Sequence, residues 1–200
     1  MGSRSALVVH PLTPARWEDF ERLFGAKGAC NGCWCMWPRL GSAYARTKGS
    51  ANKNAMRAIV DARKEPGLLG YLDGEPVAWI ALGPRSEYPP LVRSRVMKSL
   101  DGRDAWVVMC FFIAKEARGK GLTKRLLEAA AKHAKSRGAT LLEGFPNDVD
   151  PDQPPPFVWQ GLASSFEKAG FVEVARRSKR RPYLRRELGD RRGTGAPPSP

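Results

Sequence analysis

An apolar strand that runs directly into a glycine-containing turn and a helix constrains this sequence more than any other feature. Residues 107–114 are apolar, β-branched or aromatic, and too few for a buried helix with its own caps, which predicts a buried strand. From Leu122 onward, apolar residues recur at three- and four-residue spacing with basic residues largely on the opposite face. The sequence therefore predicts a strand, a sharp turn and an amphipathic helix that ends at Gly138.

The turn between this strand and this helix carries two glycines and two cations. Gly119 and Gly121 lack a Cβ, so an anion can approach the backbone closely, while Arg118 and Lys120 add charge and the Thr123 hydroxyl adds a donor. Unpaired N–H groups and the positive dipole end of a helix also favour an anion there. The turn therefore predicts a phosphate site, and the alternative is an ordinary glycine turn with solvated basic residues.

The stretch from Arg118 to Gly121 resembles motif A of the GNAT superfamily of acetyl-CoA-dependent N-acetyltransferases, in which R-G-x-G at a strand-to-helix turn holds the coenzyme A pyrophosphate. Two positions depart from the family pattern. Glu116 stands where Gln or Arg is common, and Thr123 stands where Gly or Ala is common. Neither departure removes a backbone donor. The dinucleotide fingerprint G-x-G-x-x-G and the Walker loop do not fit this turn.

The rest of the pattern predicts further strands and helices. Asp73-Gly74 between two apolar runs indicates a β-hairpin, and Thr13 followed by Pro14 suits the start of a helix that Gly25 ends. Residues 28–39 and 147–156 are expected to be loops, and 87–100 a loop or, from Leu91, a short helix. The pattern places strands at 6–9, 67–71, 76–82, 140–143, 171–175 and 182–188, and further helices at 50–64 and 163–169.

This order predicts a mixed α/β domain with helices on both faces of the sheet. It resembles the GNAT layout over nearly all of residues 7–188, and the run from Phe166 to Phe171 matches the aromatic-x-x-x-Gly-Phe turn common in that family. The resemblance implies a twisted, mostly antiparallel sheet with a splayed central strand pair. Residues 1–188 are expected to form one GNAT-like domain, because 200 residues suit one packed domain, and 189–200 a disordered tail.

The resemblance also implies a coenzyme site. Acetyl-CoA would lie with its pyrophosphate on the turn and its pantetheine arm along the backbone of residues 111–114, with a backbone N–H near Phe112 as oxyanion donor. The reaction would be direct attack by a primary amine of a small molecule on the thioester. The residues expected to contact the coenzyme are Phe111, Phe112, Ile113, Arg118, Gly119, Lys120, Gly121, Leu122, Thr123 and Phe166.

The general acid is harder to assign. Many family members place a Tyr, which protonates the leaving thiolate, where this chain has Phe166. Ser164 and its neighbour Ser165 are candidates, as are Tyr88 and Tyr183 from elsewhere in the chain. A thiolate that leaves without assistance is an equal alternative.

A carboxylate is expected to deprotonate the ammonium substrate. Glu143 is the first candidate because it lies on the strand beside the core strand, and Glu87 and Asp104 are the alternatives. A glutamate at a strand end is more often solvated or ion-paired, which is the competing interpretation of Glu143.

Cysteines gather in one predicted loop. Cys30, Cys33 and Cys35 have C-x2-C-x-C spacing, but a zinc site would need a fourth ligand, from His10, His133 or Cys110. Packing of this segment is favoured over metal binding, so no metal is expected.

In the GNAT layout this loop borders the acceptor pocket. Trp34 and Trp37 would suit an apolar or aromatic amine there, or would simply fill the core. The run from Cys33 to Trp37 resembles one found in a subset of bacterial GNAT proteins, which adds no information on the substrate.

The net charge of +14 is concentrated near the C-terminus, where residues 176–192 hold nine Lys or Arg against two acidic residues. A solvated basic face is favoured over a nucleic-acid site, since only Tyr183 interleaves with the cations. The alternatives to a small-molecule enzyme are a protein N-terminal or lysine acetyltransferase and a nucleic-acid-binding GNAT scaffold. A zinc-stabilised interaction domain is a further alternative.

No apolar run is long enough to cross a membrane, and the N-terminus lacks a signal core, so a cytoplasmic protein is expected. The family resemblance makes a homodimer an option, but no interface is legible in the sequence. The acceptor amine and the length of the acyl group are not specified either.

Overall fold

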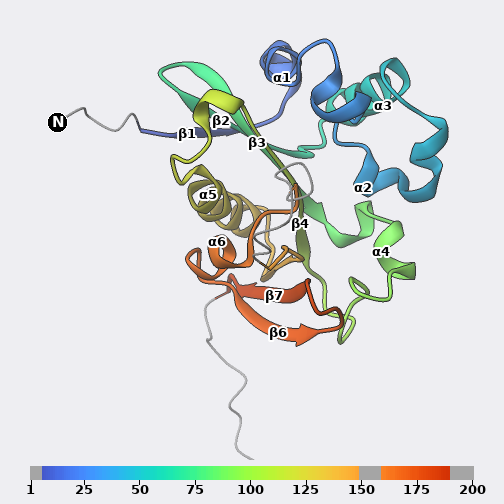
Figure 1. Cartoon of the computed structure of the whole chain (residues 1–200), viewed down its shortest axis with the longest axis vertical. Coiled ribbons are helices and arrows are strands. Elements are labelled where there is room, and N and C mark those ends of the chain that lie inside the picture. The colour runs from blue at the N-terminus through green and yellow to red at the C-terminus, as the bar shows by residue number, and fades with distance from the viewer. Residues whose placement is uncertain (1–5, 149–158, 190–200) are drawn as a thin grey trace, which may run out of the picture.

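The computed structural model describes residues 6–148 and 159–189, and its strands form one seven-stranded sheet in the order β1-β2-β3-β4-β5-β7-β6 (Figure 1). All neighbouring strands are antiparallel except β4 and β5, which run parallel. The mixed, mostly antiparallel sheet confirms the predicted fold class. The strands are β1 (Val8–Pro11), β2 (Gly67–Leu72), β3 (Glu75–Pro84), β4 (Trp106–Ile113), β5 (Leu141–Gly144), β6 (Val172–Arg176) and β7 (Pro182–Glu187).

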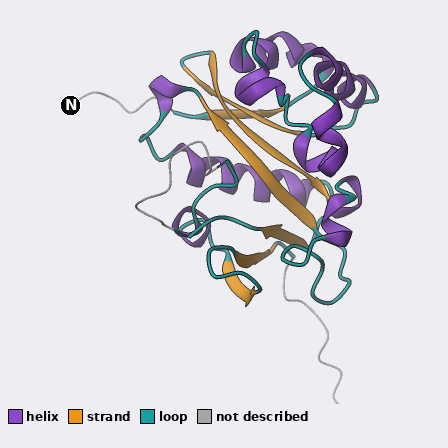
Figure 2. Ribbon diagram, turned by 45° about the vertical axis from the view of Figure 1, so that its right-hand side comes forward, coloured by secondary structure: helices purple, strands orange, loops and turns teal. Residues whose placement is uncertain are grey.

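Helices cover both faces of the sheet, as the sequence predicts (Figure 2). One face carries an aromatic core beneath α1 and α3, and the other carries an aliphatic core beneath α5 and α6. Apolar residues of α5 at three- and four-residue spacing, including Leu126 and Ala130, are fully buried in the second core. The α-helices are α1 (Trp17–Phe24), α2 (Trp37–Leu40), α3 (Ser50–Asp61), α4 (Pro90–Arg93), α5 (Leu122–Ser136) and α6 (Ala163–Glu167).

The hairpin between β2 and β3 turns at the predicted position. Asp73 has φ of 50° and Gly74 has φ of 84°. Two consecutive positive φ values are what a type I′ turn requires, and Asp-Gly adopts them at low cost. This hairpin joins β2 to β3, the strand that pairs with β4.

Some predicted boundaries were wrong by a few residues. The first strand begins at Val8 and runs to Pro11. It tolerates this proline because β1 lies at the edge of the sheet. The helix expected over 50–64 ends at Asp61. Of residues 91–100, only the first few are helical, since Ser94 already has an extended backbone.

Strands β4 and β5 diverge after a short stretch of pairing. They pair over three residues each, from Trp106 and Leu142 to Val108 and Gly144, whereas β4 continues along β3 to Ile113. This is the predicted splay of the central strand pair. It leaves the second half of β4 without β5 as a partner, immediately before the glycine turn.

Several expectations fall outside the described residues. The predicted tail, apart from Gly189, and most of the predicted loop at 147–156 belong to this part of the chain. Among the helices in the described ranges, none combines the length and apolar character needed to span a bilayer.

Candidate active site

The predicted phosphate turn lies between β4 and α5. Gly119 and Gly121 have φ of 75° and 71°, a left-handed conformation that glycine adopts at no steric cost. Gly121 is the N-cap of the 15-residue α5, and no side chain within the described ranges caps the helix there. A Cβ added at either glycine would meet no other atom within 4 Å. The turn is therefore open on the side of both glycines, and the first N–H groups of α5, which no helix bond uses, can bind an anion there.

Arg118 anchors the turn to the end of β4. Its Nε donates a hydrogen bond of 3.0 Å to the carbonyl oxygen of Ile113. The two glycines allow the sharp turn between β4 and α5, and the Arg118 hydrogen bond holds this turn against the end of β4.

A groove of about 330 Å³ runs from this turn along the splayed half of β4. Five of the residues expected at the coenzyme line it, and Ser165 of α6 lines the opposite wall. The size of the groove, the basic turn at one end and the apolar side chains along it suit a pantetheine arm followed by a pyrophosphate. The lining residues of β4, the turn and α5 are Phe111, Phe112, Ile113, Arg118 and Thr123.

The backbone donors of β4 alternate between its two sides. The Phe111 N–H donates to the carbonyl oxygen of Trp159 at 2.6 Å, while the Ala114 N–H donates to Val77 of β3 at 2.9 Å. Since N–H groups alternate along a strand, the Phe112 N–H faces β3. Because the Phe111 N–H already donates to Trp159, the oxyanion donor expected near Phe112 is better placed on Ile113, whose N–H also faces the splay.

Two residues expected at the coenzyme lie in the core instead. Leu122 is 2% exposed, so only its backbone can reach an anion at the turn. Phe166 is fully buried, with its ring centroid 6.0 Å from that of Phe111 and 5.0 Å from that of Phe171. Of the two adjacent serines on α6, Ser165 lines the groove, and Ser164 is not among the lining residues of the described chain.

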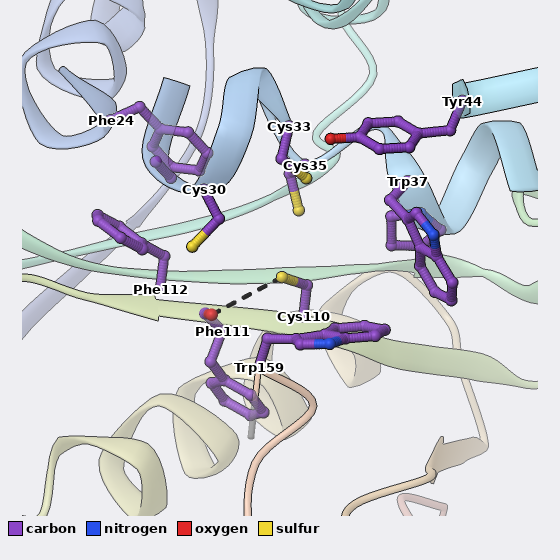
Figure 3. Close-up of a pocket in the computed structure, with 12 residues that line it drawn as sticks. Phe24, Cys30, Cys33, Cys35, Trp37, Tyr44, Cys110, Phe111, Phe112 and Trp159 are labelled. Atoms are coloured by element: carbon purple, nitrogen blue, oxygen red, sulfur yellow. Dashed lines mark hydrogen bonds between the residues drawn. The ribbon is translucent and has the colours of Figure 1, made fainter. Parts of the chain in front are cut away.

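A second cavity, of about 300 Å³, continues from the groove toward α1 and α2. The two cavities share Cys30, Phe111, Phe112 and Trp159. The wall is aromatic and sulfur-rich, and the ring of Trp37 packs edge-on against Trp159 at 4.7 Å (Figure 3). Its other lining residues are Phe24, Ala29, Cys33, Cys35, Trp37, Pro38, Tyr44 and Cys110.

The cysteine-rich loop builds one side of this cavity. Four of its non-glycine residues have positive φ, so the chain turns sharply and directs its sulfur atoms inward: Ala29, Asn31, Trp34 and Cys35. The fully buried Asn52 of α3 holds the loop by donating hydrogen bonds to the carbonyl oxygens of Gly32 at 2.9 Å and Thr47 at 3.1 Å. The positive φ values and the two Asn52 hydrogen bonds thus define the path of this loop.

The structure brings Cys110 of β4 to this loop but leaves both histidines elsewhere. His10 packs against Tyr71, and His133 lies beside Glu65 and Trp106. Within the described residues, no group of three or more His, Cys, Asp or Glu side chains is placed to hold a metal ion. Trp34, Cys35 and Met36 are buried, whereas Trp37 is 38% exposed at the cavity.

The first candidate for the base, Glu143, lies in an ion-pair network. Its side chain is fully buried, and its two oxygens accept hydrogen bonds from Arg85 at 2.6 Å and Arg185 at 3.0 Å. Arg185 also binds Asp101. Glu143 is not among the residues that line the two cavities in the described chain, so the geometry favours the ion-paired interpretation.

The other proton-transfer candidates also lie away from the cavities. Tyr88 is 1% exposed beneath the Arg39 guanidinium, and burial raises its pKa. Glu87 binds Arg39 at 2.8 Å. Asp104 is exposed at the far end of β4, and Tyr183 packs against Phe145.

The basic C-terminal residues are largely engaged within the fold. Arg176 binds Glu173 and Asp148, Arg181 binds Gln160 and Asn147, and Arg185 belongs to the buried network. These contacts direct the guanidinium groups of three described arginines toward neighbouring residues of the fold.

Comparison with known proteins agrees with this geometry. A family model described as acetyltransferase (GNAT) family matches residues 33–154. No curated protein matches the chain.

Several solved structures share the fold at 13–15% identity. A candidate acetyltransferase, YncA, from Salmonella typhimurium, solved with its cofactor acetyl-CoA, has a TM-score of 0.54 at 14% identity and covers 96% of this chain and 99% of its own. A candidate arylalkylamine N-acetyltransferase 7 from Aedes aegypti has a TM-score of 0.57 at 15% identity and covers 92% of this chain and 88% of its own. A polyamine N-acetyltransferase from Drosophila melanogaster has a TM-score of 0.52 at 13% identity and covers 90% of this chain and 98% of its own.

The family match covers more than half of the chain and includes the whole of β4, the glycine turn and α5. The splayed sheet and the glycine turn thus fall inside the matched segment. The chain belongs to the GNAT acetyltransferase family, and it is an N-acetyltransferase that uses acetyl-CoA.

Proposed function

We propose that this protein transfers the acetyl group of acetyl-CoA to the primary amine of a small, largely apolar molecule. The observation that carries this proposal is the junction of the two cavities, which share Cys30, Phe111, Phe112 and Trp159. A coenzyme in the groove would present its thioester at the point where the second cavity opens. An amine in that cavity could then attack the carbonyl carbon directly.

The groove residues divide the binding of the coenzyme among them. The N–H groups after Gly121, with Arg118 and Lys120, would hold the pyrophosphate. The splayed backbone of β4 would pair with the pantetheine arm, and the N–H of Ile113 would stabilise the oxyanion. Ser165 replaces Ser164 as the candidate donor to the leaving sulfur because it lines the groove.

The acceptor cavity favours an amine with an apolar body. Among the described residues that line it, none is an Asp, Glu, Lys or Arg. A second ammonium group would therefore lie against aromatic walls without a counter-charge, which is costly. The fold neighbours include both an arylalkylamine and a polyamine enzyme by name, and the cavity lining favours the first kind of acceptor.

A protein substrate is the second candidate. The exposed Trp37 at the mouth of the cavity could contact a peptide. A cavity of about 300 Å³ that is lined mainly by aromatic groups suits a small amine better.

A panel of acceptors tests the proposal. Phenethylamine is expected to give a kcat/KM at least about tenfold above that of putrescine, because putrescine carries a second charge into an apolar cavity. Release of coenzyme A from acetyl-CoA measures the rate for each amine. A lysine peptide and an N-terminal peptide serve as the comparison for protein acetylation. Faster turnover of putrescine, or of either peptide, would contradict the proposed acceptor class.

A further inference from the structure

The tryptophan at the start of α2 lines two cavities. Besides the acceptor cavity of about 300 Å³, a further cavity of about 280 Å³ is lined by residues of α2 and α4, which lie side by side (Figure 1). We call it the α2–α4 cavity. Its lining residues other than those of α2 are Gly41, Ser42, Pro90, Leu91, Met97 and Met109. Both cavities include Trp37 and Pro38 in their walls, so the start of α2 separates them.

An irregularity in β4 allows this strand to contribute to both cavities. Ala81 of β3 pairs with Cys110 and Leu82 pairs with Val108, so Met109 is an extra residue on β4. In a regular strand, neighbouring side chains point to opposite faces, and a bulge of this kind redirects one of them. Cys110 lines the acceptor cavity and Met109 lines the α2–α4 cavity. The two cavities therefore adjoin along the same strand.

The α2–α4 cavity is apolar. Among the described residues that line it, none carries a charge. Leu91 and Met109 are buried, and the flexible thioether of Met97 can adapt to a chain beside it. Gly41 closes one side, since a Cβ there would lie 2.8 Å from the ring of Pro90. This lining suits an aliphatic chain and disfavours an ion.

Contacts on two sides hold the Trp37 indole in place. Its ring packs edge-on against Trp159 at 4.7 Å, at one end of the acceptor cavity (Figure 3). The carbonyl oxygen of Trp159 accepts a hydrogen bond from the Phe111 N–H of β4 at 2.6 Å. On α2, the nearly buried Arg39 donates to Glu87 at 2.8 Å, which fixes the helix that carries Trp37. The indole is thus a fixed part of the wall.

We propose that Trp37 determines the length of the acceptor amine by closing the acceptor cavity toward the α2–α4 cavity. This inference rests on the proposed function, and it makes Trp37 a specificity-determining residue. An acceptor with a short apolar body ends against the indole. A longer aliphatic chain needs the space that the indole fills, and loss of the indole joins the two cavities.

The test compares hexylamine with decylamine, which share their amine and differ only in chain length. In the wild-type enzyme, hexylamine is expected to give a kcat/KM at least about tenfold above that of decylamine, because the added methylenes meet the indole. In Trp37→Ala this ratio should fall at least about tenfold, because the added methylenes are then buried in the α2–α4 cavity. Release of coenzyme A measures both rates, at decylamine concentrations below its micellar range.

Two controls separate lost specificity from a damaged fold. Trp37→Phe restores a ring at this position and should restore the preference for hexylamine. Calorimetry with acetyl-CoA should give the wild-type affinity for Trp37→Ala, since Trp37 is not among the described residues that line the coenzyme groove.

A second substitution tests where the longer chain lies. Met97→Phe fills the α2–α4 cavity from its far wall. In the Trp37→Ala background it should remove the gain for decylamine. In the wild-type background it should change the ratio of the two amines by less than about twofold, because the indole already closes that cavity.

The outcomes separate this inference from the function on which it rests. A wild-type enzyme that acetylates both amines, with the same ratio in Trp37→Ala, would overturn the role of Trp37 and leave the function intact. A gain for decylamine that persists after Met97→Phe would exclude the α2–α4 cavity as the place of the chain. A wild-type protein that binds acetyl-CoA but acetylates neither these amines nor phenethylamine would remove both the function and the inference.

Discussion

Replacing Gly121 by aspartate is expected to weaken acetyl-CoA binding by more than ~100-fold, equivalent to about 3 kcal/mol. The carboxylate would stand at the N-terminus of α5, where the pyrophosphate is proposed to bind, and would repel it. Its bulk would also fill the open space beside the N–H groups that the coenzyme needs. Isothermal titration calorimetry with acetyl-CoA measures the loss.

The fold should survive this change, because Asp tolerates a left-handed φ better than most residues and a side chain at this glycine meets no other atom within 4 Å. Gly102→Asp is the matched control. Gly102 has φ of 73° and the same open surroundings, but it lies in the loop before β4. The control should keep its affinity for acetyl-CoA. Equal affinity in Gly121→Asp would exclude the turn from the coenzyme site.

Glu143→Gln is expected to lower the free energy of unfolding by about 3–5 kcal/mol, because it leaves two guanidinium groups facing a neutral amide in a buried site. Arg85 and Arg185 each bind one oxygen of the fully buried carboxylate. Urea unfolding at neutral pH measures the change. This effect would follow from a structural role alone.

Asp61→Asn provides the comparison, since it also removes a carboxylate from an arginine, Arg57, but at an exposed site. Its effect should stay below about 0.5 kcal/mol. A Glu143→Gln protein that unfolds like the wild type but has a lower kcat with an altered pH profile would contradict the structural role. That result would restore Glu143 as the base.

The strand, turn and helix around the phosphate turn were predictable because the signals there are local. Residues 107–114 formed β4 with a one-residue shift, and Gly119 and Gly121 took the positive φ values that glycine favours. The hairpin at Asp73-Gly74 followed from the same kind of local chemistry. The family resemblance then supplied the mostly antiparallel sheet and the splayed strand pair, which local periodicity cannot specify.

The proton-transfer residues could not be predicted in the same way. Glu143 reads as a strand-end carboxylate, and its burial between Arg85 and Arg185 depends on partners 58 and 42 residues away. The grouping of Cys110 with the loop cysteines likewise requires the fold. Which of Ser164 and Ser165 faces the groove depends on the residue at which α6 begins. Helix boundaries are the part of a structure that a sequence pattern predicts least well.

The most direct test of the proposed site is a crystal structure of the protein with acetyl-CoA. The account predicts that the pyrophosphate accepts hydrogen bonds from the backbone after Gly121. The thioester should lie at the junction formed by Cys30, Phe111, Phe112 and Trp159, with its carbonyl facing the acceptor cavity. A coenzyme whose pyrophosphate lies off the turn, or whose thioester points away from that junction, would contradict the account.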